Sequence, residues 1–291
     1  MINLPQDLKV TLVGGDERQI YAGMYLAECG YDVSLLGFEK YKSSIGLCKN
    51  LMLIEELKNS NVVVLPMPVS QDGVNVFMPL SDNTVKICDL PLLVGENALI
   101  LGGRTGETEK TTGKRVVDYF EREELQIANA YLTAESAVAI AMKKRKESIR
   151  DNGVLVVGYG RIGKCLCHIL KGMGVNVYAS ARKRKDFEWI RAYGYSPVDT
   201  SKVCNVVSEC KIVFNTVPGL VIGREILYCM PKDCLVVDLA SKPGGVDFEA
   251  ANEFGLKTVW ALGLPGKELP QSAGRVVAKT IIGILEDEGV V

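Results

Sequence analysis

Histidine is almost absent from this sequence: His168 is the only one among 291 residues. It falls in the body of a predicted helix, where a side chain is poorly placed to take a proton from a substrate. This position counts against a histidine-dependent hydroxyacid dehydrogenase and against a Ser-His-Asp nucleophile. No His-x-x-x-His or Cys-x-x-Cys spacing is present, so a metal site would lack its usual ligands.

Excess charge and long apolar runs are also missing. The formal net charge is −1, so bulk electrostatics favours neither nucleic acid nor an anionic membrane as a partner. No apolar run approaches the roughly 20 residues that span a bilayer, and no signal peptide precedes the first strand. The nine cysteines are an odd number without a Cys-x-x-Cys pair, which indicates a reducing compartment. We therefore expect a cytoplasmic protein.

A dinucleotide-binding pattern lies in the middle of the chain. The apolar run from Val154 leads into Gly158-Tyr159-Gly160-Arg161-Ile162-Gly163, and a helical stretch leads to a second apolar run at Val175. In such a unit the three glycines allow a tight turn, approach of a pyrophosphate and close packing of helix on strand. The positive helix N-terminus would hold the pyrophosphate. The strand-helix-strand frame favours a nicotinamide cofactor over a structural glycine turn.

The end of the second strand favours NADP over NAD. An NAD site usually has Asp or Glu there to bind the ribose hydroxyls, whereas this chain has Ser180 and then Ala181-Arg182-Lys183-Arg184-Lys185. Ser180, Arg182 and Lys183 are candidates for the 2′-phosphate site, because clustered cations suit a dianion. A solvated basic start to the next helix is the alternative, and it leaves NAD possible.

Two doubly wound α/β domains are predicted. In the first half, strand-like runs alternate with helical patterns, and the runs are Lys9 to Val13, Tyr31 to Leu36, Val62 to Leu65 and Ala98 to Leu101. Helical patterns there include Leu51 to Lys58 and Lys114 to Glu121. The second half has six strands, near Val154, Val175, Tyr195, Ile212, Leu235 and Thr258. Such alternation is typical of a parallel sheet covered on both faces.

The expected boundaries are residues 1–128 for a Rossmann-like or flavodoxin-like substrate domain and residues 129–271 for a Rossmann NADP-binding domain. The stretch 129–136 leads into a helix that would run to about Arg150 and join them, with Thr133 as its N-cap and Glu135 in its first turn. A loop over 263–270 precedes an amphipathic helix, residues 272–291, that is expected to pack back on the first domain.

Several polar loops are expected at the carboxyl edge of the second sheet. Asn215-Thr216-Val217-Pro218 follows the fourth strand, and Asp238-Leu239-Ala240-Ser241-Lys242-Pro243-Gly244-Gly245 follows the fifth. Each alone suits ordinary turn chemistry, but together with the glycine turn they favour a site. The residues expected to border the cofactor are Thr216, Val217, Pro218 and Ala240. The Gly14-Gly15 turn lacks a third glycine and carries acids, so it is interpreted as a substrate-facing loop.

These segments together resemble the A subunits of bacterial dipicolinate synthases. The resemblance rests on Thr133-Ala134-Glu135, the glycine motif, the 238–245 loop and Leu264-Pro265-Gly266-Lys267, in that order. Gly14-Gly15-Asp16 and Asp118-Tyr119-Phe120 fit as well, so it covers essentially the whole chain. The family tends to have Pro and Gly where this chain has Leu132 and Ser136, and Lys-Thr where it has Gln271-Ser272.

The resemblance implies oxidation of dihydrodipicolinate to dipicolinate with reduction of NADP, in the mother cell of a spore former. It also implies that the partner is the flavoprotein-like B subunit of the synthase. The substrate is a small ring dicarboxylate, which needs cationic or amide donors. Arg18, Lys242 and Lys267 are candidates for carboxylate binding. Thr133 and Ser241 would donate hydroxyls, and Glu135 would take the ring proton.

Two other functions stay open. The lack of a recognisable acid–base pair is compatible with an NADP-binding regulatory module that controls a partner without catalysis. An NADP-dependent dehydrogenase of a small keto or hydroxy acid is the second alternative, although the missing histidine and the 238–245 loop count against it. The oligomeric state is open too, and a homo-oligomer is possible.

Overall fold

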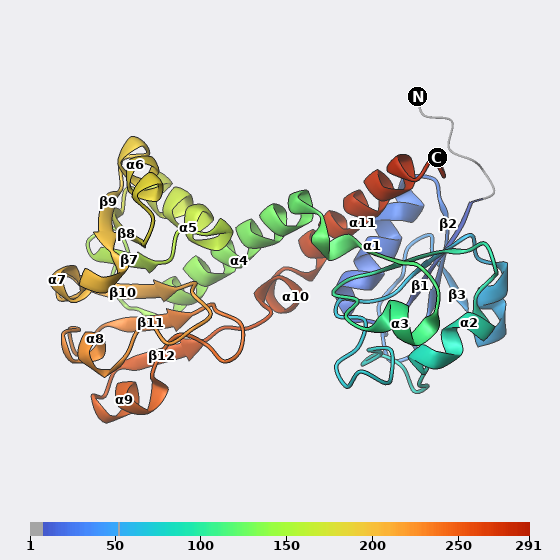
Figure 1. The fold of residues 1–291 in the computed structure, drawn as a ribbon, viewed down its shortest axis with the longest axis horizontal. Helices are drawn as coiled ribbons and strands as arrows, with labels where there is room; N and C mark the ends of the chain where they lie inside the picture. The colour runs from blue at the N-terminus through green and yellow to red at the C-terminus, as the bar shows by residue number, and fades with distance from the viewer. Residues whose placement is uncertain (1–7, 52) are drawn as a thin grey trace. The chain divides into compact units, whose positions relative to one another are not determined.

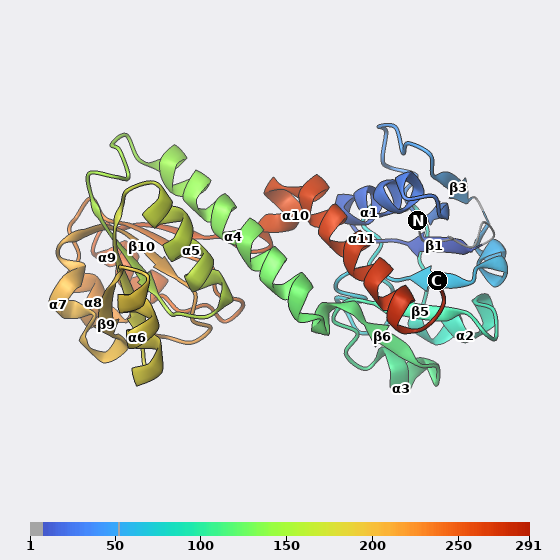
Figure 2. The same ribbon diagram turned by 90° about the horizontal axis from the view of Figure 1, so that it is seen from above.

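A computed structural model describes residues 8–51 and 53–291 of the chain (Figures 1 and 2). The chain forms two compact units. Unit 1 comprises Met1–Asn129 and Leu269–Val291, and unit 2 comprises Ala130–Glu268. Each unit contains a six-stranded sheet, and every recorded strand pair within these sheets is parallel. No helix of the described residues is long and apolar enough to cross a membrane.

The sheet of unit 1 has the strand order β3-β2-β1-β4-β5-β6, which is the order of a Rossmann fold. The strands are β1 (Lys9–Val13), β2 (Asp32–Leu36), β3 (Lys49–Leu51), β4 (Val62–Val64), β5 (Leu99–Gly102) and β6 (Val116–Asp118). The helices are α1 (Glu17–Glu28), η1 (Ile54–Asn59), η2 (Ile87–Asp89), α2 (Leu90–Leu93), α3 (Thr108–Thr112), η3 (Tyr119–Glu121) and α11 (Pro270–Asp287).

Helix α11 comes from the end of the chain and packs along α1, as both ribbon views show. The two helices share one core on their face of the sheet, to which α1 gives Ile20 and Leu26 and α11 gives Val277 and Ile281. They approach closely at Gly274, where an added Cβ would lie 2.5 Å from the carbonyl oxygen of Arg18. A separate apolar cluster covers the opposite face of the sheet. Unit 1 therefore depends on both ends of the chain.

Unit 2 repeats the same topology, with the order β12-β11-β10-β7-β8-β9. Its strands are β7 (Gly153–Val157), β8 (Asn176–Ala181), β9 (Ser196–Asp199), β10 (Cys210–Asn215), β11 (Leu235–Asp238) and β12 (Lys257–Trp260). Its helices are α5 (Arg161–Gly172), α6 (Arg184–Ala192), η4 (Thr200–Lys202), α7 (Cys204–Val207), α8 (Arg224–Tyr228), α9 (Phe248–Glu253) and α10 (Leu264–Glu268). Helix α4 (Glu123–Lys144) begins in unit 1 and continues into unit 2.

The predicted fold class is confirmed, because both units are doubly wound parallel sheets and all six strands expected in the second half are present. Strands buried on both faces are recognisable as continuous apolar runs. Val154 to Val157 illustrates this, since none of its four side chains is more than 1% exposed.

One expectation for unit 1 was wrong, and a second was correct only in part. The stretch Lys114 to Glu121 was expected to be helical, but Val116–Asp118 forms edge strand β6 on β5 and only a 3-10 turn follows. Two adjacent β-branched valines suit a strand better than a helix. Leu51 to Lys58 was also expected to be helical; most of this stretch is a 3-10 helix, Ile54–Asn59, but its start at Leu51 was wrong because Lys49–Leu51 is strand β3.

Two expectations for the connecting segments were also wrong. Helix α4 begins at Glu123, so Thr133 lies inside it and is not its N-cap. The stretch from Glu123 to Lys144 contains no glycine or proline, and two glutamates in the first turn favour a start there. Residues 263–270 were expected to form a loop, but Leu264–Glu268 is helix α10.

Candidate functional site

The glycine turn between β7 and α5 is shaped by contacts inside unit 2. Gly158 has φ of +98°, a conformation that residues with a Cβ rarely adopt. A Cβ on Gly158 would collide with Thr216 Oγ1 and Val217 Cγ2. A Cβ on Gly163 would collide with the carbonyl oxygen of Gly158. The first and third glycines are therefore required by the packing of the unit itself.

The middle glycine of the motif, Gly160, has no such internal reason. It is the N-cap of α5 with φ −81° and ψ −165°, an ordinary extended conformation, and an added Cβ would meet no atom within 4 Å. A glycine in open space at a helix N-terminus leaves room for a pyrophosphate to approach the backbone. The residues present therefore fit a dinucleotide.

The residues at the end of β8 have different environments. Ser180 is fully buried, where its Oγ accepts a hydrogen bond of 3.3 Å from Gly158 N–H and bonds to Thr200 Oγ1 at 3.2 Å. The Ser180 side chain therefore stabilises the backbone of the glycine turn through this hydrogen bond to Gly158. Arg182 and Lys183 follow the strand and are exposed. Arg182 and Lys183 are thus the first of four consecutive exposed basic residues, 182–185, that a ligand can reach at this strand end.

The other residues of the motif line the turn in different ways. Tyr159 is buried, its ring lies 5.6 Å from Lys164 Nζ, and burial raises the pKa of its hydroxyl. Ile162 packs partly buried against the core of unit 2, and Arg161 is exposed at the first position of α5. The Tyr159 hydroxyl therefore stays neutral at physiological pH.

Asn215 and Asp238 join two strand ends beside this turn. They face each other in the register of β10 and β11, both are fully buried, and Asn215 Nδ2 donates to Asp238 Oδ1 at 2.7 Å. The Asn215 side chain also holds the loop after β10, because Nδ2 donates to Val217 O and Oδ1 accepts from Val217 N–H.

The Asp238 carboxylate organises the loop after β11. Ala240 N–H donates to Oδ1 at 3.0 Å and Gly245 N–H donates to Oδ2 at 2.8 Å. The loop between these two anchors exposes Ser241 and Lys242. A carboxylate held by several N–H groups is stabilised without a neighbouring cation, so Asp238 fixes the base of a loop whose tip is polar and basic.

Thr216 links the loop after β10 to the glycine turn. Its N–H and its Oγ1 both donate to Val157 O, at 2.9 and 3.0 Å. Val217 is half-buried, and Pro218 is exposed beyond it. The predicted cofactor residues Thr216, Val217 and Ala240 thus lie on loops tied to one carboxyl edge, where ligands bind in parallel sheets.

The predicted catalytic residues are spread over several elements. Thr133 is buried and Glu135 exposed on α4, and Lys267 is exposed on α10. Within the described residues, the side chains of Glu135, Ser241, Lys242 and Lys267 make no hydrogen bond or ion pair. All of these residues belong to unit 2, whereas Arg18 belongs to unit 1.

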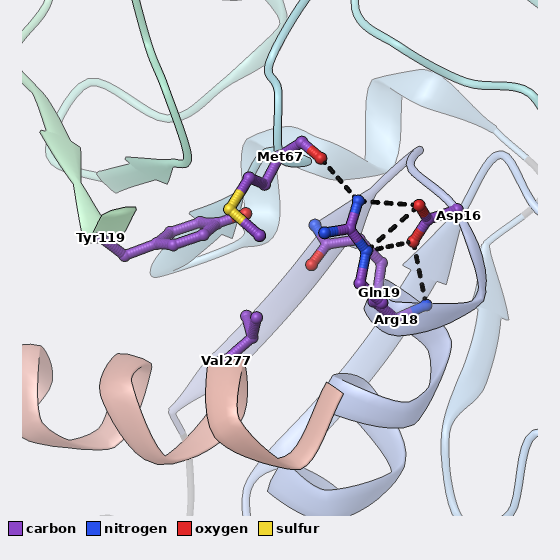
Figure 3. Close-up of a pocket in the computed structure, with 6 residues that line it drawn as sticks. All are labelled: Asp16, Arg18, Gln19, Met67, Tyr119 and Val277. Carbon is purple, nitrogen blue, oxygen red and sulfur yellow. Dashed lines mark hydrogen bonds and ion pairs between the residues drawn. The ribbon is translucent and has the colours of Figure 1, made fainter. Parts of the chain in front are cut away.

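Arg18 lies in a small pocket of unit 1 (Figure 3). Asp16 is the N-cap of α1, and its carboxylate accepts from Arg18 Nε at 2.8 Å and from Nη2 at 2.8 Å. Nη2 also donates to Met67 O at 2.9 Å. The Arg18 side chain is only 18% exposed, and these hydrogen bonds hold its guanidinium in one orientation.

Sequence reasoning missed four residues that shape these sites. Asn215 and Asp238 were recognised only as parts of loops, although polar residues that end adjacent apolar strands are a signal for paired positions. Gln19 and Tyr119 line the Arg18 pocket and were not singled out. For Gln19 no signal was available, because a glutamine in an amphipathic helix is normally assigned to its exposed face.

Comparison with known proteins agrees with the fold of each unit. Residues 9–122 match the family described as the N-terminal domain of the dipicolinate synthase A subunit. Residues 123–241 match the NAD-binding domain of the D-isomer specific 2-hydroxyacid dehydrogenases. The A subunit of dipicolinate synthase from Bacillus subtilis (strain 168) is 29% identical over 288 residues, which cover 96% of each chain.

Two solved structures share the whole fold. The dipicolinate synthase A chain from Bacillus subtilis has a TM-score of 0.86 at 27% identity, covering 98% of this chain and 97% of that one. The A subunit from Bacillus halodurans has a TM-score of 0.84 at 27% identity, covering 95% and 97%. The resemblance predicted from the motifs is confirmed, and the chain is an NAD(P)-dependent oxidoreductase with a nicotinamide dinucleotide-binding domain.

Proposed function

Because this chain is a relative of the dipicolinate synthase A subunit over nearly its whole length, we propose that it oxidises dihydrodipicolinate to dipicolinate with NADP. The observation that carries the proposal is that both units match known families. Residues 9–122 match the N-terminal domain family of the synthase A subunit, and residues 123–241 match a dinucleotide-binding domain. A shared dinucleotide domain alone would leave the substrate open.

The choice of NADP rests on the charges at the end of β8. Arg182 and Lys183 are exposed there, and Ser180 stands where NAD sites usually have a carboxylate. Asp199 ends the neighbouring strand, but its Oδ1 accepts from the N–H and Oγ of Ser201. These hydrogen bonds lower the pKa of Asp199 and direct its carboxylate to η4. We assign Arg182 and Lys183 to the 2′-phosphate.

The reaction removes one hydride and one proton from the substrate ring and leaves an aromatic pyridine. NADP, when bound, supplies the hydride acceptor. Arg18, Lys242 and Lys267 would bind the two carboxylates, and Thr133 and Ser241 would donate hydroxyls to the substrate. Glu135 would take the ring proton. Because aromatisation favours the product, a weak base suffices, which agrees with a chain whose one histidine is exposed on the body of α5.

We further propose that the chain works with a second protein, the B subunit of the synthase. The Bacillus subtilis relative is named as the A subunit of its enzyme, and a B subunit follows from that name. A role in sporulation, in the cytoplasm of the mother cell, follows from the proposed product. The dicarboxylate would be the small-molecule partner and the B subunit the protein partner.

The test is a spectroscopic assay with freshly generated dihydrodipicolinate. The full chain is mixed with NADP or NAD, with and without the B subunit, while absorbance is recorded at the reduced-nicotinamide band and at the pyridine dicarboxylate bands. The proposal expects both signals to rise together and faster with NADP. No rise in any condition, with NADP binding demonstrated by titration, would favour the regulatory module instead.

A further inference from the structure

Gln19 has an unpaired amide in the interior of unit 1. The residue is only 3% exposed, and its Nε2 has no hydrogen-bond partner within the part of the chain that the structure describes. Burying an amide donor without a partner is unfavourable, and proteins rarely keep such groups. A buried donor that lines a pocket is explained if a ligand accepts its hydrogen bond.

Arg18 offers a second donor in the same pocket. Its Nε and Nη2 are engaged by Asp16 and by Met67 O, but none of the described residues accepts from Nη1. Figure 3 shows this third guanidinium nitrogen and the Gln19 amide directed to the same side, toward Tyr119 and Val277. Asp16 thus fixes the guanidinium so that one nitrogen faces the pocket beside the buried amide.

Apart from the Asp16 carboxylate, which also lines the pocket, the remaining walls are apolar. Met67, Tyr119 and Val277 line it together with the two donors. The Tyr119 hydroxyl donates to Leu65 O at 3.1 Å, and burial raises its pKa, so the ring contributes a neutral surface. The pocket therefore combines two N–H donor groups with the Asp16 carboxylate and three apolar side chains, and it suits one small acceptor group such as a single carboxylate, with the rest of the ligand outside it.

The charge of the pocket also limits its ligand. Asp16 forms a 2.8 Å ion pair with Arg18 and so offsets its charge, and the Asp16 side chain is 34% exposed. A phosphate dianion would meet this carboxylate at close range without a compensating cation. A carboxylate carries one charge over two oxygens and matches the two donors in number.

We propose that this pocket is the subsite for one carboxylate of the substrate, with Arg18 Nη1 and Gln19 Nε2 donating to its two oxygens. Gln19 is the specificity-determining residue, because its buried amide gains a partner only when the carboxylate is present. The identification of the ligand as a ring dicarboxylate rests on the function proposed above. The pairing of Gln19 with a carboxylate rests on the pocket alone.

The experiment compares Gln19→Leu with the unmodified full chain. Calorimetry with NADP present measures binding of pyridine-2,6-dicarboxylate and of pyridine-2-carboxylate, in buffer free of divalent metal ions. Loss of one hydrogen bond to a charged group is expected to weaken dicarboxylate binding about tenfold or more. The Tm should stay the same or rise, because an unpaired buried amide has been removed. A merely structural glutamine would not separate these two readouts.

A second variant of Gln19 and a control variant at another glutamine complete the test. Gln19→Glu preserves the size of the side chain, but the introduced carboxylate would accept from Arg18 Nη1 and repel the ligand, so binding should fall at least as far. Gln71→Leu, at an exposed glutamine of unit 1, is the matched control and should bind as the unmodified chain does. Unchanged dicarboxylate affinity in both Gln19 variants would overturn the subsite.

Turnover of dihydrodipicolinate by the unmodified chain, measured with and without the B subunit, separates the two proposals. Turnover with an unchanged KM in Gln19→Leu would reject the subsite and leave the function standing. Absence of turnover, with dicarboxylate binding that depends on Gln19, would reject the function and leave the subsite standing. Absence of both turnover and dicarboxylate binding would reject both.

Discussion

Asn215 Nδ2 donates a 2.7 Å hydrogen bond to Asp238 Oδ1, and neither side chain is exposed. Two further N–H donors, from Ala240 and Gly245, complete the environment of this carboxylate. Asn215 at the same time holds Val217 in the next loop. One buried side-chain pair therefore positions the two loops that carry several of the predicted cofactor and substrate residues.

Replacement of Asp238 by alanine should damage both stability and cofactor binding. It would leave three buried N–H donors without an acceptor, and we expect the free energy of unfolding to fall by roughly 3 kcal/mol. Urea denaturation measures this loss, and a titration with NADP measures the effect on the loops. Asp151→Ala, at an exposed position, is the control and should change stability by less than about 0.5 kcal/mol. Equal midpoints for the two variants would contradict the role given to Asp238.

Alanine substitutions at two glycines of the motif should have different effects, one mainly on stability and the other mainly on cofactor binding. Gly163→Ala places a Cβ against the Gly158 carbonyl, so the unfolding free energy should fall by about 1–3 kcal/mol. Gly160→Ala meets no protein atom within 4 Å, so it should cost less than about 1 kcal/mol. It should nevertheless weaken NADP binding about tenfold or more, because the methyl group would occupy the approach of the pyrophosphate. Undiminished NADP affinity in Gly160→Ala would place the pyrophosphate elsewhere.

The preference for NADP should depend on Arg182 and Lys183. With both changed to alanine, the Kd for NADP is expected to rise about tenfold or more, while the Kd for NAD changes by less than about twofold. Added salt should reduce the difference between the two cofactors in the unmodified chain, because the cations are exposed. Lys146→Ala removes an exposed charge from the segment before β7 and is the control. Parallel losses for both cofactors would show that these residues do not recognise the 2′-phosphate.

The buried strands and the glycine turn were predictable because their causes are local. Central strands such as β7 and β10 are apolar on both faces, and a doubly wound sheet requires this. Edge strands lack that signal: β3 has two exposed residues among its three. The start of α4 was misplaced at Thr133 because Thr133 and Glu135 have the residue types of a helix start, although the uninterrupted helical stretch begins at Glu123.

The side-chain arrangement of the candidate sites depends on contacts between distant residues. Ser180 was predicted beside the 2′-phosphate from its place in the chain. It is instead buried under the glycine turn, where its Oγ accepts a hydrogen bond from Gly158 N–H. The Asp16 and Arg18 ion pair is local, two residues apart. The burial of Gln19 is not, because its pocket is closed by Met67, Tyr119 and Val277 from three other parts of the chain.

The packing of α11 on α1 predicts opposite effects for two glycines of the same helix. A Cβ on Gly274 would lie 2.5 Å from Arg18 O and 2.6 Å from Tyr21 Cβ, so Gly274→Ala must push the helices apart. A Cβ on Gly283 would make only an ordinary contact, 3.7 Å from Arg122 Nη2. Alanine also has the higher helix propensity, by about 1 kcal/mol. We therefore expect Gly274→Ala to lower the free energy of unfolding by about 1–3 kcal/mol and Gly283→Ala to raise it slightly.

Thermal denaturation of the two variants beside the unmodified chain measures this difference. Because Arg18 lies on the segment of α1 that Gly274 contacts, the first variant should also disturb the guanidinium and weaken dicarboxylate binding, whereas the second should not. If Gly274→Ala were as stable as Gly283→Ala and bound dicarboxylate equally well, the close approach of α11 to α1 would have no part in holding Arg18. If only its stability fell, the contact would support the fold of unit 1 but leave the pocket independent of it.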